Sequence, residues 1–429
     1  MNTSDNPLSA QMSAMGQAAR RGAEALRLSD AQTRTRAITA MAASLRARSE
    51  PILAANAKDL ATARDNGVSG PMLDRLALDA GRLEAIAASL EVVAAIPDPL
   101  GEVMNHWTRP NGLDFSRVRT PIGVIAMIYE SRPNVTADAA ALCIRSGNAV
   151  VLRGGSECIA SNLAIHAAVV EGLEAAGLPA DCVQAVPTPD RAAVGLILAG
   201  LCDERGERCV DLIIPRGGKS LVARVQSEAR APVLGHLEGL CHTFVHEAAD
   251  LTKACEVVVN AKLRRVSVCG SLETLLIDKV AAQTLLPPIA AALMAKGCEL
   301  RGDAASMALV PGMSLATEED WRTEYLAPIL AVRIVEGVAG AADHIRVYGS
   351  GHTDAIITED KVAAEAFIAA VDSAIVLVNA STQFADGGEF GFGAEIGIAT
   401  DKLHARGPVG AEQLTTYKYV VRGTGQTRP

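Results

Sequence analysis

The chain has 429 residues and a mass of 44.6 kDa, a length that usually folds as two or three domains. Apolar residues make up 49% of it and charged residues 21%, which excludes disorder over most of the length. Aromatic residues are only 3%, so the core must be aliphatic. The net charge of −9 argues against nucleic acid or an anionic membrane as the main partner.

Nine cysteines lie between residues 143 and 298, with no CxxC spacing among them. An odd number without paired spacing argues against a disulfide framework and a zinc site, so no metal centre is expected. The segment 1–15 lacks a basic stretch followed by an apolar run, and we expect no secretory signal. No apolar run reaches the roughly 18 residues of a membrane span. We therefore expect no membrane partner and a cytoplasmic protein.

Helical periodicity marks the chain from residue 11 to about residue 95. Apolar residues recur there at steps of three, four and seven, at Ile38, Met41, Leu45 and Ile52. The pattern then changes at Asn111-Gly112, where a turn between two extended runs predicts a β-hairpin. Two interpretations of the hairpin stay open: an ordinary surface hairpin, or one that projects and pairs with a neighbouring chain.

From residue 121, strands and helices alternate, which is typical of a parallel sheet covered on both faces. The predicted strands are 122–129, 149–152, 183–186 and 210–214, and the predicted helices are 137–145, 156–176, 191–199 and 219–229. The face of helix 156–176 that we expect to be buried carries Ile159, Leu163, Ala167 and Val170. Ligands of such a sheet bind beyond the carboxyl ends of its strands.

A second stretch of the same type begins near residue 236. It has a predicted helix at 251–262 and predicted strands at 274–277, 330–334 and 375–378. A glycine-rich segment at 384–393 and a final strand at 416–421 follow. The alternation predicts a second α/β domain.

Two glycine turns each follow a predicted strand and open a predicted helix. They are Leu152–Glu157 (LRGGSE) and Ile214–Ser220 (IPRGGKS). Glycine lets the backbone approach a ligand, and a helix N-terminus offers free N–H groups to a phosphate. A dinucleotide is the natural occupant, although neither turn matches the GxGxxG fingerprint. The alternative, a pair of tight structural turns, stays open.

Cys269 follows Arg264 and Arg265, and nearby cations favour a thiolate over a thiol. For any single cysteine of the nine, a buried structural role is nevertheless the simpler interpretation. His404 stands two residues before Arg406, which is a weak signal for an anion site. These residues by themselves do not select a catalytic group.

Three groups of segments occur together in one order. They are Glu130–Thr136 (ESRPNVT), then Asn260–Lys262 with Ser267–Cys269 and Glu273–Leu276, and finally Gly393–Ile398 with Leu403–Pro408. The whole resembles the γ-glutamyl phosphate reductase (glutamate-5-semialdehyde dehydrogenase) family of the aldehyde dehydrogenase superfamily, from about residue 11 to residue 422. The resemblance implies an α/β, aldehyde dehydrogenase-like fold with two Rossmann-like α/β domains and a small β oligomerisation flap.

The resemblance also implies where these parts lie. The NADP-binding domain would take residues 1–103, 121–235 and 381–412, the catalytic domain with its nucleophilic cysteine 236–380, and the flap 104–120 and 413–429. The active site would lie in the cleft between the two large domains, whose closure would exclude water.

The implied reaction is the second step of proline biosynthesis from glutamate. NADPH would reduce L-glutamyl 5-phosphate to L-glutamate 5-semialdehyde with release of phosphate. By resemblance, Cys269 would attack the acyl phosphate to give a thioester, and the Asn134 side chain with the Cys269 backbone N–H would stabilise the oxyanion. A homo-oligomer is expected. Association with a glutamate 5-kinase, attractive because the acyl phosphate is unstable, stays open.

The cofactor residues implied by the resemblance lie at the glycine turns and at one later glutamate. Arg153 would pair with a 2′-phosphate and so favour NADPH over NADH, and Glu324 would bind the nicotinamide ribose. The others are Gly154, Gly155, Ser156, Glu157, Gly217 and Gly218. The basic candidates for binding the anionic groups of the substrate, without assignment to particular groups, are Arg132, Arg265, His404 and Arg406.

One position departs from hydrolytic aldehyde dehydrogenases. Where they carry a glutamate that activates water, this chain has His236, with Glu238 two residues away. Water must not attack the thioester of an acyl phosphate reductase, so this departure fits the implied reaction. The alternatives are a hydrolytic or CoA-acylating dehydrogenase on the same fold, a silent binding or scaffolding protein, and a thiol hydrolase.

Overall fold

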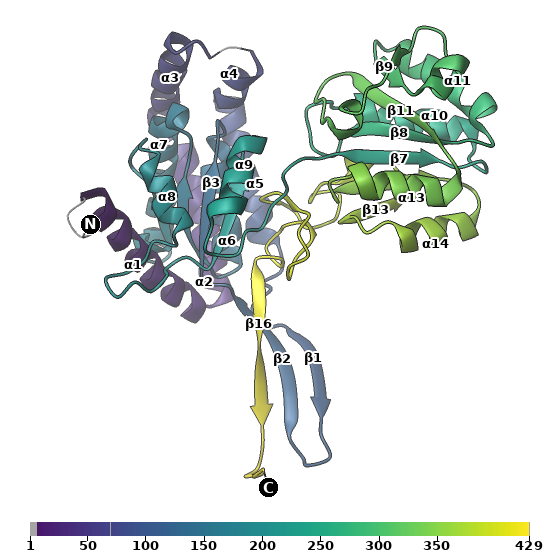
Figure 1. The fold of residues 1–429 in the computed structure, drawn as a ribbon. Coiled ribbons are helices and arrows are strands. Elements are labelled where there is room, and N and C mark those ends of the chain that lie inside the picture. The colour runs from purple at the N-terminus through teal and green to yellow at the C-terminus, as the bar shows by residue number, and fades with distance from the viewer. Residues whose placement is uncertain (1–6, 69, 429) are drawn as a thin grey trace.

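The computed structural model describes residues 7–68 and 70–428 and arranges them in three parts. Two α/β domains lie side by side, and a three-stranded antiparallel sheet extends away from them (Figure 1). Residues 12–234 and 396–414 build one hydrophobic core, and residues 245–357 build another. Each domain therefore closes its own core, and the chain crosses from one domain to the other twice.

The first domain is built on a parallel sheet with the strand order β5-β4-β3-β6. The strands are β3 (Val124–Tyr129), β4 (Ala149–Arg153), β5 (Val183–Ala185) and β6 (Leu212–Arg216), as predicted within two residues at each end. The crossover helices are α6 (Asn134–Arg145), α7 (Ile159–Ala175), α8 (Ala192–Leu198) and α9 (Lys219–Glu228). Since β3 comes first in the chain but lies between β4 and β6, the topological switch point is at β3 and β6.

Five helices at the start of the described chain confirm the predicted helical region. They are α1 (Pro7–Leu28), α2 (Ala31–Ala47), α3 (Ser49–Asp65), α4 (Pro71–Leu76) and α5 (Ala80–Ala95). Ile38, Met41 and Leu45 are fully buried on α2, and Ile52 is fully buried on α3. Helix α2 packs against α5 and against the crossover helices α6 and α7, and the predicted apolar residues belong to the core of this domain.

The predicted buried face of α7 is wrong. The helix buries Ser161, Asn162, Ile165, Ala168, Val169, Gly172 and Leu173. The predicted residues Ile159, Leu163 and Val170 are only partly buried, and Ala167 is exposed. Because α7 is apolar on nearly all sides, its sequence selects no face. With the short helix η2 (Ser156–Cys158) it is long and apolar enough to cross a membrane, but it packs on α2 and α3 inside the domain, as a core helix does.

The second domain carries a seven-stranded sheet of order β10-β9-β11-β8-β7-β12-β13 in which all pairings are parallel. Its strands are β7 (Cys241–Val245), β8 (Leu272–Asp278), β9 (Glu299–Gly302), β10 (Ser314–Leu315), β11 (Ile329–Val335), β12 (Thr353–Ile357) and β13 (Ile375–Val378). Its helices are α10 (Leu251–Leu263), α11 (Ala282–Met294), α12 (Ala304–Leu309), α13 (Gly337–Tyr348) and α14 (Lys361–Ala370). Strands β7, β9, β10 and β12 were not predicted. In β7 and β12 the buried pair His242 and Asp354, 2.8 Å apart, interrupts the apolar pattern.

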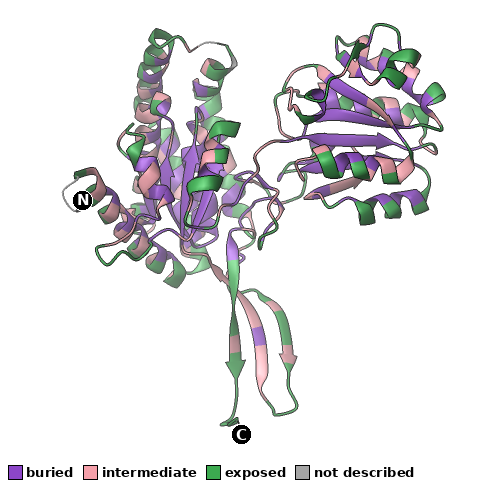
Figure 2. Cartoon of the chain, in the orientation of Figure 1, coloured by how far each residue is buried: buried purple, intermediate pink, exposed green. Residues whose placement is uncertain are grey.

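The predicted hairpin is present as β1 (Val103–Thr108) and β2 (Asp114–Pro121), which the final strand β16 (Thr415–Arg422) joins to make the projecting sheet. Figure 2 shows that β1 and β16 are mostly exposed. The chain returns from the second domain between β13 and β16, over residues 379–414 (the returning segment). This segment contains a two-stranded pair, β14 (Ile398–Ala399) and β15 (Gly407–Pro408).

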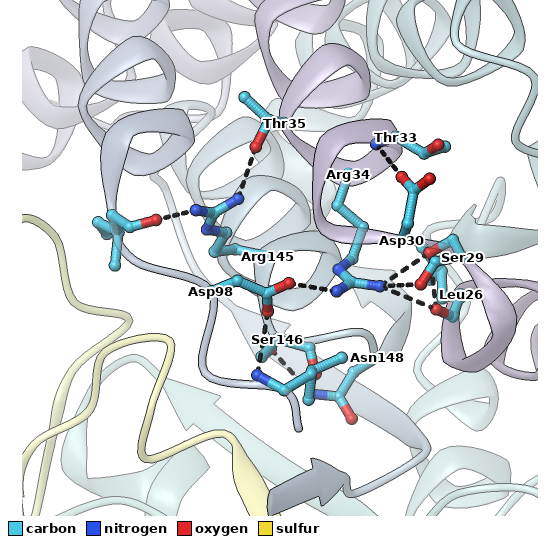
Figure 3. Close-up of polar contacts among 12 residues, drawn as sticks. Leu26, Ser29, Asp30, Thr33, Arg34, Thr35, Asp98, Arg145, Ser146 and Asn148 are labelled. Atoms are coloured by element: carbon cyan, nitrogen blue, oxygen red, sulfur yellow. Dashed lines mark hydrogen bonds and ion pairs between the residues drawn. The ribbon is translucent and has the colours of Figure 1, made fainter. Parts of the chain in front are cut away.

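Buried polar contacts fasten the root of the projecting sheet to the first domain (Figure 3). Arg34 on α2 pairs with Asp98 at 2.5 Å, and Arg145 on α6 donates to the carbonyl of Ile96. Asn148 donates to the carbonyl that precedes β16 at 2.8 Å. These contacts fix both chain segments that enter the projecting sheet.

Candidate active site

The second sheet turns its amino edge, where its strands begin, toward the first domain (Figure 1). Cys269 lies in the loop between α10 and β8. His236 precedes β7, Glu324 precedes β11, and His352 directly precedes β12. Ligands of parallel sheets usually bind at the carboxyl edge. Here the segment that crosses from the first domain to the second, residues 235–240 (the crossing segment), enters at the beginning of β7. The amino edge is therefore the one that meets the other domain.

Gly239, in the crossing segment, lies directly against Cys269. A Cβ atom at position 239 would lie 2.1 Å from the Cys269 carbonyl oxygen and 2.7 Å from its Cα. The Cys241 thiol donates to the same carbonyl at 3.1 Å, and the Gly239 N–H donates to Glu324 Oε1 at 3.1 Å. One segment therefore positions both Cys269 and Glu324, and only glycine leaves room for this approach.

The first domain contributes the carboxyl ends of β3 and β6 to the site. The Glu130 N–H donates to the Arg216 carbonyl at 3.0 Å and joins these two strand ends. The positive charge of Arg216 acts on Cys269 and His236 in the facing domain. Arg216 belongs to the second glycine turn, and no motif linked it to the cysteine.

Burial raises the pKa of Cys269 to about 11, although the Arg216 charge opposes this rise. The prediction that Arg264 and Arg265 favour the thiolate is wrong. Both side chains are exposed, and the cation that lowers the pKa comes from the other domain. The thiol at this site therefore needs a proton acceptor before it can act as a nucleophile.

Arg132 is the arginine of the predicted anion-binding set whose charge interacts with Cys269. Burial and the charges of Arg216, Arg75 and Arg265 lower the pKa of Arg132 to about 10, and the sulfur of Cys269 acts in the opposite direction. Like charges held together in this way favour binding of an anion with more than one negative charge. Of the four predicted anion-binding residues, Arg132 thus interacts with Cys269, and the exposed Arg265 acts on Arg132.

The other two predicted anion-binding residues have partners elsewhere. His404 is exposed, and its Nε2 lies 3.0 Å from the carbonyl of Gln413. Arg406 pairs with Asp372 at 2.8 Å. Both contacts hold the returning segment, so the structure gives these residues a role in the fold rather than one beside Cys269.

Asn134 opens α6, and its amide donates to Asp138 at 2.9 Å, which leaves a second amide N–H for another acceptor. Shortly before it, Ser131 has a positive φ of 43°, which is strained for a residue with a side chain. Glu157 holds Ser131 by accepting from its N–H at 2.7 Å and its hydroxyl at 2.6 Å. The strained turn fixes where Arg132 and Asn134 leave the sheet.

Carboxylates of the protein itself fill the space over the predicted phosphate-binding turns. A Cβ at Gly155 would lie 2.1 Å from Glu157 Oε1, and one at Gly217 would lie 2.4 Å from Glu130 Oε2. The Gly218 N–H donates to the same Glu130 oxygen at 2.8 Å. A pyrophosphate at the start of α9 therefore requires Glu130 to turn away.

Arg153, at the end of β4, offers a buried cation beside the first glycine turn. Its guanidinium donates to the carbonyls of Pro189, at 3.0 Å, and of Gly154. Its Nε is buried without a hydrogen-bond partner among the described residues. Ser156 is exposed where the turn ends. An unsatisfied buried donor next to an exposed hydroxyl fits a phosphate group of a dinucleotide.

A buried ion pair supports the segment that carries Glu324. Lys262 Nζ and Glu273 Oε2 lie 2.6 Å apart, and the two side chains are 0% and 1% exposed. Glu273 also accepts from the N–H of Leu326 at 3.4 Å, where the chain turns with a positive φ of 51°. Burial raises the pKa of Glu273 to about 7, while the charge of Lys262 lowers it. The two family-like segments 260–262 and 273–276 thus meet in one structural contact.

Two histidines lie beside Cys269. A ring nitrogen of His236, a ring nitrogen of His352 and the Cys269 sulfur all lie within 4.8 Å of one another. The two rings meet edge to face with their centroids 4.9 Å apart, and burial lowers the pKa of both. The aligned glutamate position pointed to His236. His352 stands in no motif of the sequence, so nothing there singled it out.

The family model described as the aldehyde dehydrogenase family matches residues 5–297. The γ-glutamyl phosphate reductase of Caulobacter vibrioides is 77% identical over 97% of this chain and 100% of its own. This chain belongs to the γ-glutamyl phosphate reductases of the aldehyde dehydrogenase family. The crystal structure of the Thermotoga maritima γ-glutamyl phosphate reductase matches it with a TM-score of 0.94 at 42% identity, over 97% of this chain and 100% of that one.

Membership in the γ-glutamyl phosphate reductases confirms the predicted fold class and the assignment as an oxidoreductase, and it counts against the binding-protein and thiol-hydrolase alternatives. An engineered glycolyl-CoA reductase solved with bound NADP⁺ shares the fold, with a TM-score of 0.67 at 17% identity over 95% of this chain and 96% of that one. The individual site residues stay predictions, which the following variants test.

Gly239→Ala tests whether the crossing segment positions Cys269. The new methyl group forces the Cys269 backbone to move, and we expect kcat of the reductase to fall about 100-fold while the fold is kept. The matched control is Gly195→Ala on α8, where a Cβ would meet nothing within 4 Å. Equal kcat values for the two variants would contradict this positioning role.

Lys262→Met tests the buried ion pair. Removing one partner leaves the Glu273 carboxyl buried without its counter-charge, so the free energy of unfolding in urea should fall by about 3–5 kcal/mol. The double variant with Glu273→Leu should regain most of that loss, because no uncompensated charge remains. A double variant as unstable as the single one would show that packing, rather than charge, explains the effect.

Proposed function

We propose that this chain reduces L-glutamyl 5-phosphate to L-glutamate 5-semialdehyde and phosphate, with NADPH and through a thioester on Cys269, as the second step of proline biosynthesis from glutamate. The observation that carries the proposal is the meeting of Cys269 with the arginines of the facing domain. It supports the proposal because cations beside a thiol suit a substrate that is a phosphorylated amino acid.

Cys269 attacks the acyl carbonyl, and phosphate leaves. Since burial holds the pKa of the thiol near 11, the proton must go to a nearby base. His236 meets the requirement: its Nδ1 lies 2.7 Å from the Ile398 carbonyl, which can only accept, so Nδ1 carries the hydrogen and Nε2 keeps a lone pair. The thiol proton passes to that nitrogen.

Negative charge develops on the carbonyl oxygen in both tetrahedral species. The second amide N–H of Asn134 and the Cys269 backbone N–H are the proposed donors. Arg132, with Arg216 and Arg265 around it, takes the phosphate and the α-carboxylate of the substrate. We assign no role at the substrate to His404 or Arg406, whose contacts hold the returning segment.

The residues at the first glycine turn fit NADP(H). Arg153, with its unsatisfied Nε, and Ser156 would hold the 2′-phosphate, and the open side of Gly218 would take the pyrophosphate after Glu130 moves. Glu324, held by the Gly239 N–H, would bind the nicotinamide ribose. When bound, NADPH supplies the hydride that reduces the thioester.

The surroundings of Glu238 support a reaction in which water does not attack the thioester. Glu238, the carboxylate nearest to the aligned position of the hydrolytic base, pairs with Lys219 at 2.7 Å. Its charge is therefore engaged, and it is not a free base for activating water. This favours the phosphate-dependent reaction over a hydrolytic one.

The assembly and the compartment of the protein follow from the same proposal. The projecting sheet carries the exposed residues Tyr417, Tyr419 and Val421 on β16, which suits pairing with another copy and so a homo-oligomer. A biosynthetic reductase with free thiols fits the cytoplasm. Association with a glutamate 5-kinase would protect the unstable acyl phosphate in transit.

Running the reaction in reverse tests the proposed function. Glutamate 5-semialdehyde and NADP⁺ should give NADPH only when phosphate is present, because phosphate must cleave the thioester. Cys269→Ser should lower this rate at least about 1000-fold. The control Cys255→Ser, on α10, should keep it. NADPH formation without phosphate would place the protein in the hydrolytic branch, and formation that needs CoA would place it in the CoA-acylating branch.

Arg153→Met tests the proposed 2′-phosphate contact. Loss of a charged hydrogen bond should raise KM for NADP⁺ about tenfold or more, with little change in KM for NAD⁺, because only the first carries that phosphate. The ratio of the two constants corrects for a general loss of folded protein. An equal rise for both cofactors would move Arg153 out of the phosphate contact.

A further inference from the structure

We propose that Cys269, His236 and His352 form a binding site for a soft divalent cation of the zinc type, and that a cation bound there reversibly blocks the Cys269 sulfur. The site was not expected, since the cysteines show no metal-binding spacing. Its three ligands come from three separate segments, and such a site leaves no spacing in a sequence. The inference goes beyond the proposed function, because metal binding does not depend on turnover.

The geometry of the three side chains supports the site. Their ligand atoms lie within 4.8 Å of one another. Zinc binds sulfur at about 2.3 Å and imidazole nitrogen at about 2.0–2.1 Å, so tetrahedral ligand atoms lie about 3.4–3.6 Å apart. An approach of roughly 1 Å completes the site. Three protein ligands leave the fourth position open for water or an anion, as in catalytic zinc sites.

His352 carries the strongest evidence for a ligand. The residue is 0% exposed, and its Nε2 is buried with no hydrogen-bond partner among the described residues. Its Nδ1 lies 2.9 Å from the Thr353 hydroxyl. A buried ring nitrogen without a partner costs free energy, and a metal ion is one group that would satisfy it.

Both rings are prepared in the way that metal-binding histidines are. Such a histidine usually donates its second ring N–H to a carbonyl, a carboxylate or another acceptor, which fixes the ring and its tautomer. The Ile398 carbonyl accepts from Nδ1 of His236, and the Thr353 hydroxyl, which can donate or accept, lies 2.9 Å from Nδ1 of His352. When that hydroxyl accepts, the Nε2 atom of each ring is free to bind a cation.

The charges around Cys269 permit a cation to enter. Arg216 and Arg132 oppose it, but the carboxylates of Glu395 and Glu324 also act on Cys269 and are of the opposite sign. On binding, the sulfur–hydrogen bond is replaced by a sulfur–metal bond, and the thiol proton leaves to solvent. No oxidation or reduction occurs, so a chelator should reverse the block completely.

Cobalt(II) is the probe for the site, because its absorption reports a thiolate ligand directly. We expect the metal-free full-length protein to bind one Co²⁺ per chain, with a sulfur-to-cobalt charge-transfer band and the visible bands of a tetrahedral ion. Cys269→Ser should abolish the charge-transfer band. His236→Gln and His352→Gln should each weaken Co²⁺ binding at least about tenfold. The control Cys255→Ser should behave as wild type.

Alkylation of the unmodified protein gives a second readout that needs no variant. Zn²⁺ should protect Cys269 from iodoacetamide, as measured by mass spectrometry of its peptide, and a chelator should restore the reaction. Unprotected Cys269 at saturating Zn²⁺, or a charge-transfer band that survives Cys269→Ser, would overturn the site. A protein that fails the reverse reaction but binds Co²⁺ through Cys269 would refute the proposed function and leave this inference standing.

Discussion

The close contact between Gly239 and Cys269 is the constraint on which the site depends. The crossing segment touches the cysteine loop so tightly that a single Cβ atom would collide with the Cys269 carbonyl. Through the same few residues it donates to Glu324 and begins β7. Contacts at the boundary between the domains, rather than contacts inside either domain, therefore fix the position of Cys269.

The proposed chemistry is divided between two separate hydrophobic cores. The second domain carries Cys269 and the two imidazoles, and the first carries Arg132 and Arg216 after its strands β3 and β6. Cys269 is buried strongly enough that its pKa stays high despite Arg216. A thiol of this kind is protected from adventitious reaction, and it becomes a nucleophile only when a base takes its proton. The same three ligand-type side chains that make such a proton transfer feasible also make the site attractive to a soft cation.

Buried and internal charges hold the less regular parts of the site. Lys262 and Glu273 support the turn that carries Glu324, and Glu157 holds the strained Ser131. Glu130 covers the start of α9 where an anion was predicted. In each case a carboxylate accepts a hydrogen bond from a backbone N–H of the protein itself. Access of a phosphate to α9 is then a competition between two anions for the same N–H group.

The sequence by itself determined the alternation of strands and helices, the helical region before residue 95, the hairpin, and the glycine turns after β4 and β6. These follow from local periodicity and turn chemistry, which need no partner elsewhere in the chain. The family-like motifs added Cys269 as the nucleophile candidate. Periodicity and composition do not distinguish it from the other eight cysteines.

Tertiary structure alone decided the rest. It selected the buried face of α7, which is apolar on nearly every side, and it revealed β7 and β12, whose buried His242–Asp354 pair breaks the apolar pattern. It showed that Arg216, and not Arg264 or Arg265, is the cation acting on Cys269, and that His352 lies beside the Cys269 sulfur. These relations join residues far apart in the chain, and long-range proximity leaves no periodic signal in a single sequence.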